Sequence, residues 1–367
     1  YILRYNLQGK QIQTGVLLYE GKGNDENFFV LMAQPPNRVT SESIPAREYI
    51  FVVDVSGSMV GFPLDVTKKL IRNLAKGLRP VDTFNVLLFA GDSEVLFPKS
   101  MPATAENLRQ AMRVLDGQSG GGSTRLLPAL RNAYNMPHGE NTSRNILIIT
   151  DGYISAEKDI FREIDDHLSD ANVFAFGIGS GVNRHLVEGI AKTAMGEAFV
   201  VTKKAQASHV AGKFKTYIES PVLTGISVDF DGFNAYDVEP KNVPDLFASR
   251  PIVMMGKWKG KLGGTIKITG HSGLGEYSQD ISLKSLKANE SNSALRYLWA
   301  RKKIERISDY NVGYINADQI EDITALGLRY NLLTKYTSFV AVSEIVVNKK
   351  GAAKNVKQPL PLPQGVA

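Results

Sequence analysis

Short apolar runs alternate with amphipathic stretches between residues 48 and 220, and this alternation restricts the fold more than any other feature. The runs lie at 49–54, 84–90, 145–150, 172–178 and 197–201. In the stretches between them apolar residues recur at helical spacing, as at Leu64, Leu70, Ile71 and Leu74. Near-continuous apolar strands that alternate with helices are typical of a parallel sheet with helices on both faces. We therefore predict a doubly wound, mostly parallel α/β domain over 48–220, with an antiparallel edge strand at 94–97.

The segments on either side of this region have strand patterns without helices. Residues 1–34 alternate in the manner of strands, and three further strand-like runs occur between 224 and 269. Three strands without a helix make a poor independent domain, so both segments need a second sheet to pack on. We interpret residues 1–47 and 221–290 as the two halves of one β-sandwich into which the α/β domain is inserted.

The remaining residues, 291–367, predict a helical extension and a linker. Amphipathic patterns indicate helices at about 293–308 and 317–330, and an apolar run indicates a last strand at 338–343, within an extension that covers 291–347. Residues 348–367 are rich in proline and lysine, which favours an extended linker. Because the chain opens in mid-pattern at Tyr1, without an initiator methionine, we expect it to be a fragment.

Composition narrows the class of protein. The 367 residues contain no cysteine, which excludes disulfides and thiolate metal sites. No run of 18 apolar residues occurs, so no membrane span is predicted in this sequence. The net charge of +6 comes from scattered lysines and arginines, so nucleic acid is not an expected partner. The oligomeric state stays open.

The first apolar run of the α/β region ends in an unusual set of oxygen-bearing side chains. Residues 49–54 are followed by the sequence Asp54-Val-Ser56-Gly-Ser58. Mg²⁺ and Ca²⁺ prefer oxygen ligands, and carboxylate and hydroxyl groups on a tight turn can converge on one point. The alternative interpretation is that Ser56 and Ser58 only cap the next helix.

Two further segments carry oxygen ligands where a doubly wound sheet would bring them beside this turn. A glycine-rich loop at 120–124 ends in Thr124, and the buried run 146–150 ends in Asp151-Gly152. Gly152 permits a sharp turn and a close approach of the backbone. Because the carboxyl ends of parallel strands meet at one edge, we expect Asp54, Ser56, Ser58, Thr124 and Asp151 to face a common metal ion.

This constellation resembles the metal-ion-dependent adhesion site of a von Willebrand factor A domain. The resemblance covers residues 48–220 and implies that the two serines and Thr124 supply hydroxyls, while Asp54 and Asp151 act directly or through water. It implies Mg²⁺ as the ion, with Mn²⁺ or Ca²⁺ able to substitute. The flanks, with residues 298–304 and 336–342, resemble bacterial proteins in which a vault inter-alpha-trypsin (VIT) domain precedes an A domain. They are also similar to inter-alpha-trypsin inhibitor heavy chains.

The resemblance implies a non-enzymatic, cation-dependent adhesion module. Its partner would be a protein that offers an Asp or Glu carboxylate to the metal, and its location would be extracellular, on the cell surface or periplasmic. One alternative is a scaffold protein whose metal only stabilises the fold.

A metal-dependent phosphohydrolase is a further alternative. Its Asp-x-Asp motif would need a second acid, the general acid, where this chain has Ser56. The sequence predicts neither catalytic residues nor an organic cofactor. The glycines at 177–181 lack the third glycine of a dinucleotide fingerprint.

Overall fold

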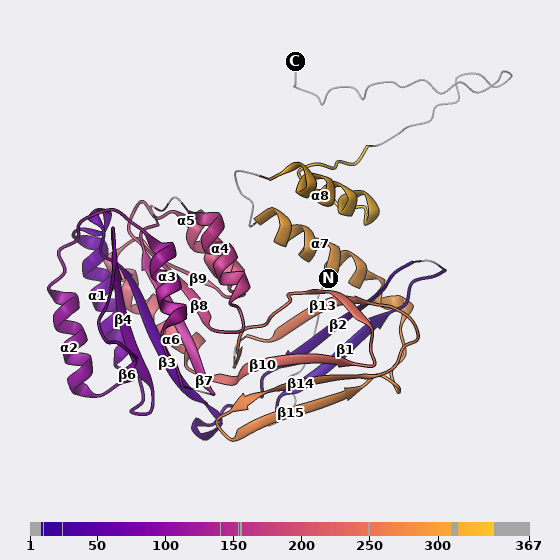
Figure 1. Cartoon of the computed structure of the whole chain (residues 1–367), viewed down its shortest axis with the longest axis horizontal. Helices are drawn as coiled ribbons and strands as arrows, with labels where there is room; N and C mark the ends of the chain where they lie inside the picture. Colours follow the sequence, from indigo (N-terminus) through magenta and orange to yellow (C-terminus); the bar gives the residue numbers. More distant parts are fainter. Residues whose placement is uncertain are drawn as a thin grey trace, which may run out of the picture.

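The computed structural model describes residues 9–340, except residues 10, 24, 140, 153, 155, 249 and 310–314. A layered α/β region and a region of two antiparallel sheets lie next to each other, with two helices, α7 and α8, beside the second region (Figure 1). The predicted strand at residues 1–5 lies outside the described residues.

The α/β region is built on a seven-stranded, mostly parallel sheet. Its strands follow the order β5-β4-β3-β7-β8-β9, with β6 paired to β4. The strands are β3 (Ala46–Asp54), β4 (Thr83–Phe89), β5 (Ser93–Val95), β6 (Met101–Pro102), β7 (Thr142–Thr150), β8 (Asn172–Ile178) and β9 (Ala198–Val201). All neighbours from β4 to β9 are parallel, whereas β5 and β6 run antiparallel to β4. The predicted doubly wound sheet is confirmed, including the antiparallel edge strand after β4.

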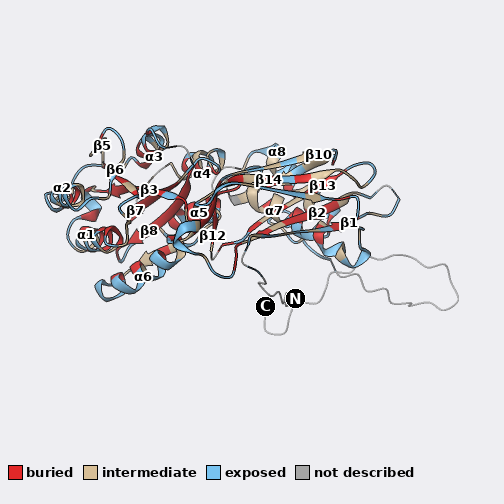
Figure 2. Cartoon of the chain, turned by 90° about the horizontal axis from the view of Figure 1, so that it is seen from below, coloured by how far each residue is buried: buried red, intermediate tan, exposed pale blue. Residues whose placement is uncertain are grey.

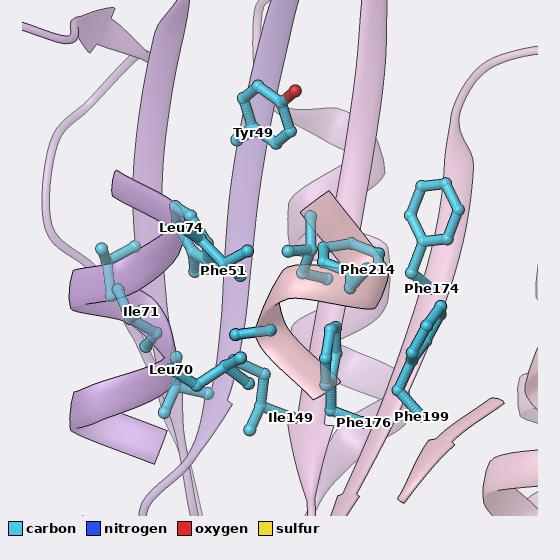
Figure 3. Close-up of a cluster of buried hydrophobic side chains, with 14 of the residues drawn as sticks. Tyr49, Phe51, Leu70, Ile71, Leu74, Ile149, Phe174, Phe176, Phe199 and Phe214 are labelled. Atoms are coloured by element: carbon cyan, nitrogen blue, oxygen red, sulfur yellow. The ribbon is translucent and has the colours of Figure 1, made fainter. Parts of the chain in front are cut away.

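Helices cover both faces of this sheet. They are α1 (Phe62–Ala75), α2 (Ala105–Asp116), α3 (Leu126–Asn135), α4 (Glu157–Asp166), α5 (Arg184–Thr193) and α6 (Ala207–Ile218). Alternate residues of β3 point to opposite faces. Phe51 packs with α1, α2 and α6, and Val52 packs with α3, α4 and α5. Figure 3 shows the first of these clusters, to which α1 contributes Leu70 and Leu74 and α6 contributes Phe214 on the face of the sheet that carries Phe51. The central strands are therefore buried along their length (Figure 2).

Two four-stranded antiparallel sheets form the second region. One has the order β1-β2-β13-β11 and the other β12-β10-β14-β15. The strands are β1 (Gln13–Tyr19), β2 (Asn27–Gln34), β10 (Pro221–Asp231), β11 (Ala235–Glu239), β12 (Leu246–Phe247), β13 (Ile252–Trp258), β14 (Thr265–Ser272) and β15 (Gly275–Ser282). Both sheets contribute to one hydrophobic cluster, for example Leu31 from β2 and Ile268 from β14. Because β2 pairs with β13, strands from before and after the α/β region share a sheet. The insertion of the α/β domain into a β-sandwich stays a prediction.

The C-terminal helices α7 (Ala294–Asp309) and α8 (Ala317–Arg329) confirm the predicted helical extension. Trp299 of α7 packs with Phe28 of β2 and with Tyr330, which follows α8, so α7 lies against the outer face of the β1-containing sheet.

The predicted strand at 338–343 is wrong for its described part. Residues 338–340 have no strand conformation, and residues 341–343 lie outside the described residues. Phe339 and Val340 are 70% and 78% exposed. A strand needs a hydrogen-bonding neighbour, and residues 338–340 pair with no strand of the described residues.

Candidate metal site at the carboxyl edge of the parallel sheet

The candidate site lies where β3 and β7 end side by side. The two strands are parallel neighbours in a register that pairs Val53 with Ile149, so the residues after each strand leave the sheet at the same edge. Asp54 is the last residue of β3 and is fully buried, and Asp151 directly follows β7 and is 5% exposed. The fold thus brings two buried acids to one edge.

The carboxylate of Asp54 is held by two neutral donors. The backbone N–H of Ser56 donates to Oδ1 at 2.9 Å, and the hydroxyl of Thr150 donates to Oδ2 at 2.6 Å. Burial raises the pKa of Asp54, and the charge of Asp151 raises it further, although the bonds from Ser56 and Thr150 act in the opposite direction. A cation beside these acids would favour their charged form.

The two serines do not cap a helix. Ser56 precedes the short 3-10 turn η2 (Gly57–Met59), but its side chain makes no capping hydrogen bond, and the N-cap of α1 is Gly61. The hydroxyls of Ser56 and Ser58 instead lie 3.2 Å apart, with Ser56 buried and Ser58 exposed. The capping interpretation is therefore not supported, and both hydroxyls remain available to a ligand.

The glycine-rich loop is joined to this turn through its backbone. Gly121 N–H donates to the carbonyl of Val55 at 2.9 Å, and Gly57 N–H donates to the carbonyl of Gly122 at 3.2 Å. Gly120 and Gly122 both have positive φ, which favours glycine. Thr124, two residues beyond Gly122, is partly exposed. Two backbone hydrogen bonds thus fasten the loop against the Asp54–Ser58 turn.

Asp151 has an unpartnered buried oxygen. Its Oδ1 is buried and finds no hydrogen-bond partner among the described residues. Its carbonyl accepts the N–H of Asn183 at 3.0 Å, and Gly152, at φ +88°, packs against Asn183 so closely that a Cβ would lie 2.8 Å from that of Asn183. A buried carboxylate oxygen without a donor is costly unless a cation satisfies it.

The donor set fits Mg²⁺ or a similar hard cation. Asp54, Ser56 and Ser58 are linked by hydrogen bonds or close contact, Asp151 is near enough to affect the pKa of Asp54, and the loop that leads to Thr124 is bonded to the same turn. No cluster of three or more histidine, cysteine or acidic side chains suited to a metal occurs in the described part of the chain. A metal here would therefore depend on hydroxyls as well as on the two acids.

Sequence reasoning missed Thr150 and Asn183. Thr150 orients Asp54 and also accepts the N–H of Gly152 at 2.9 Å. Asn183 caps α5 by accepting the N–H of Leu186, and its side-chain amide donates to Glu157 at 2.7 Å. A hydroxyl at the end of an otherwise apolar run was the available signal for Thr150. An asparagine before a helical pattern was the signal for Asn183.

Comparison with known proteins agrees with the fold of the α/β region. Residues 47–199 match the sequence model of the von Willebrand factor type A domain. The chain contains a von Willebrand factor A domain. Domains of this family commonly serve in adhesion and protein interaction.

The relatives extend beyond the A domain. A von Willebrand factor A domain-containing protein of Dictyostelium discoideum is 28% identical over 81% of this chain, which spans 15% of that protein. Inter-alpha-trypsin inhibitor heavy chain H3 of Bos taurus is 24% identical over 80% of this chain, which spans 36% of that protein. The chain therefore corresponds to a minor part of these relatives.

A solved structure shares the fold over most of both chains. The structure described as von Willebrand factor type A from Catenulispora acidiphila has a TM-score of 0.60 at 12% identity. The likeness covers 90% of this chain and 89% of that one.

Proposed function

We propose that this chain is a divalent-cation-dependent protein-binding module that coordinates an acidic group of its partner. The observation that carries the proposal is the buried Oδ1 of Asp151, which has no partner among the described residues. It lies at the same edge as Asp54 and the paired hydroxyls of Ser56 and Ser58. A buried carboxylate oxygen without a partner costs free energy, and a bound cation would offset this cost.

The protein's own residues prepare the site. Thr150 and the N–H of Ser56 fix both oxygens of Asp54, and the two backbone bonds between the loop and the turn hold the segment that leads to Thr124. Asp54, Ser56, Ser58, Thr124 and Asp151 would hold Mg²⁺, with Mn²⁺ or Ca²⁺ as substitutes. The bound ion would supply positive charge at this edge. Two carboxylates and neutral hydroxyls do not saturate that charge, so a further acidic ligand can coordinate the ion.

The proposal is of a binding site rather than a catalytic one. The position where an Asp-x-Asp phosphohydrolase needs its general acid holds Ser56, which has no acidic proton to give. We expect the protein to act outside the cytoplasm, on a surface or as an exported protein, because A domains commonly serve adhesion. Within the described residues, no helix has both the length and the apolar character needed to cross a membrane.

A column of immobilised glutamate-rich peptide tests the proposal. We expect the wild-type chain to be retained in Mg²⁺ and released by EDTA, and Asp54→Ala to be retained weakly in both. A second column that carries a glutamine-rich peptide of the same length is the matched control. Non-specific attraction arising from the net charge of +6 would survive EDTA and would therefore be recognised.

The scaffold alternative predicts a different result. If Mg²⁺ raises the unfolding temperature of the wild-type chain but retention is equal in Mg²⁺ and EDTA, the metal only stabilises the fold and the binding proposal is wrong. Asp65→Asn, which removes an exposed acid in the first turn of α1, controls for general loss of negative charge.

A further inference from the structure

A cleft separates the A domain from the C-terminal helix α7. It has a volume of about 200 Å³ and lies between α4 and α5 on one side and α7 with the end of β11 on the other. Phe161, Leu168 and Met195 line it together with charged side chains from both sides. Figure 1 shows α4 and α5 facing α7 across this boundary.

Ion pairs span the cleft. Lys192 of α5 lies 2.6 Å from Glu305 of α7, measured from Nζ to Oε1, and both side chains are partly exposed. Arg306 of α7 lies 3.9 Å from Asp165 of α4. Exposed and half-exposed pairs of this kind are individually weak and are screened by salt.

Helix α7 packs apolar residues on the outer face of the β1-containing sheet. Leu295, Trp299 and Ala300 share a cluster with β2, and this cluster is separate from the one that α4 and α5 form with the parallel sheet. Arg306 and Lys303 of α7 also pair with the buried Glu239 of β11, at 2.9 Å and 2.6 Å. Helix α7 is therefore fixed to the antiparallel sheets, and ion pairs connect it to the A domain.

A second connection between the two regions is buried and well bonded. Asp245 accepts hydrogen bonds from Ser143 at 2.6 Å and from Asn172 at 2.8 Å, at the amino ends of β7 and β8. Arg250 donates to the side-chain oxygen of Asn172 at 3.1 Å, and Phe247 inserts into the core of the A domain. This joint resists opening, since separation would leave buried polar groups unpaired.

We propose that Lys192–Glu305 and Arg306–Asp165 form an ionic latch that holds the cleft closed. When the latch breaks, the A domain turns away from α7 about the buried joint at Asp245 and Arg250. The joint is at the amino edge of the parallel sheet. This rotation therefore displaces the opposite, carboxyl edge, which carries Asp54 and Asp151, further than it displaces the amino edge. The latch thereby sets the orientation in which that edge is presented, independently of what binds there.

Distance measurement across the cleft tests the latch. The chain has no cysteine, so Glu188→Cys on α5 and Arg301→Cys on α7 place two spin labels at exposed positions outside the latch. We expect one short label–label distance at low salt, a longer and broader distribution at about 1 M NaCl, and the longer distribution already at low salt in Lys192→Met with Asp165→Asn. The charge swap of Lys192→Glu with Glu305→Lys keeps an ion pair with reversed signs at this position and should keep the short distance at low salt.

Lys213→Met is the matched control, because it breaks an exposed pair with Glu197 inside the A domain. It should leave the label distance unchanged. A distance that responds neither to salt nor to the latch variants overturns the proposal. If the double variant does not fold, the salt titration of the labelled parent chain decides alone. The test uses no metal and no partner, so its result is separate from that of the proposed function.

Discussion

The two edges of the parallel sheet both bury acids but treat them differently. At the amino edge, Glu48 pairs with Arg144 at 2.6 Å, and Asp82 is held by Arg47 and Arg79. At the carboxyl edge, Asp54 is held only by neutral donors, and Oδ1 of Asp151 has no partner among the described residues. The first arrangement neutralises charge inside the protein. The second leaves buried negative charge without a cationic partner among the described residues, which is why we propose that the first edge stabilises the fold and the second binds a cation.

Breaking a pair at the amino edge should have the largest effect. Arg144→Met leaves Glu48 buried without its cationic partner, although the hydroxyl of Ser100 still donates to it, and the side chains of Arg144 and Glu48 are each 2% exposed. We expect a loss of about 3–5 kcal/mol in the free energy of unfolding, measured by urea denaturation. Arg131→Met, which breaks an exposed pair with Glu163, should cost less than about 1 kcal/mol. Equal losses in the two variants would contradict the assignment.

Removing an acid at the carboxyl edge should lower the stability of the protein only when a divalent metal ion is present. Without divalent ions, Asp151→Asn should be at least as stable as the wild type, because it removes an unpartnered buried charge. With Mg²⁺ at about 100 times its Kd, the wild type should gain about 2.7 kcal/mol and the variant nothing, as measured by thermal unfolding. Destabilisation of metal-free Asp151→Asn would show that this acid has a structural partner after all.

The buried acid Asp82 at the amino edge should contribute to the pH dependence of the free energy of unfolding. Burial alone would raise the pKa of Asp82, but hydrogen bonds from Arg47 and Arg79 and the charge of Arg47 lower it below the ordinary value. A lowered folded-state pKa stabilises the protein above the unfolded-state pKa, and this contribution is lost as the pH falls through the folded-state value. The loss amounts to about 1.4 kcal/mol for each unit of lowering. Asp82→Asn should flatten the acid limb of a stability–pH curve, whereas an unchanged limb would refute this role.

The smallest effect on the fold is expected at Ser58. Ser58 is exposed, its hydroxyl lies 3.2 Å from that of Ser56, and it caps no helix among the described residues. Ser58→Ala should therefore change the metal-free stability by less than about 0.5 kcal/mol, whereas loss of a helix cap costs about 1 kcal/mol. Mg²⁺ affinity should nevertheless fall. A variant that loses stability but keeps its Mg²⁺ affinity would restore the capping interpretation.

The difference between the regions also explains what the sequence could predict. The parallel strands are nearly continuous apolar runs buried on both faces, so their positions and the edge at which Asp54 and Asp151 emerge follow from the pattern. Strand β15 was missed because it lies at a sheet edge and most of its residues are exposed, which leaves no apolar run to detect. Strand β12 is two residues long, and β11 is short and only partly buried.

The hydrogen bonds of the candidate site were harder to predict from the sequence than the strands. The sequence pointed to Asp54, Ser56, Ser58, Thr124 and Asp151, but the bond from Thr150 to Asp54 depends on the register of β3 and β7. The ion pairs of the amino edge join residues up to 96 positions apart, and charge patterns along the chain do not encode such pairs. Long-range partners of single polar side chains need the assembled sheet.

Calorimetric titration with Mg²⁺ tests the central claim most directly. We predict saturable binding to a single site in the wild-type chain, and none in Asp54→Ala or Asp151→Asn while both variants keep the wild-type circular dichroism spectrum. Absence of binding to the wild type by Mg²⁺, Mn²⁺ and Ca²⁺, or undiminished binding in both variants, would contradict the claim that the carboxyl edge of the sheet is a cation site.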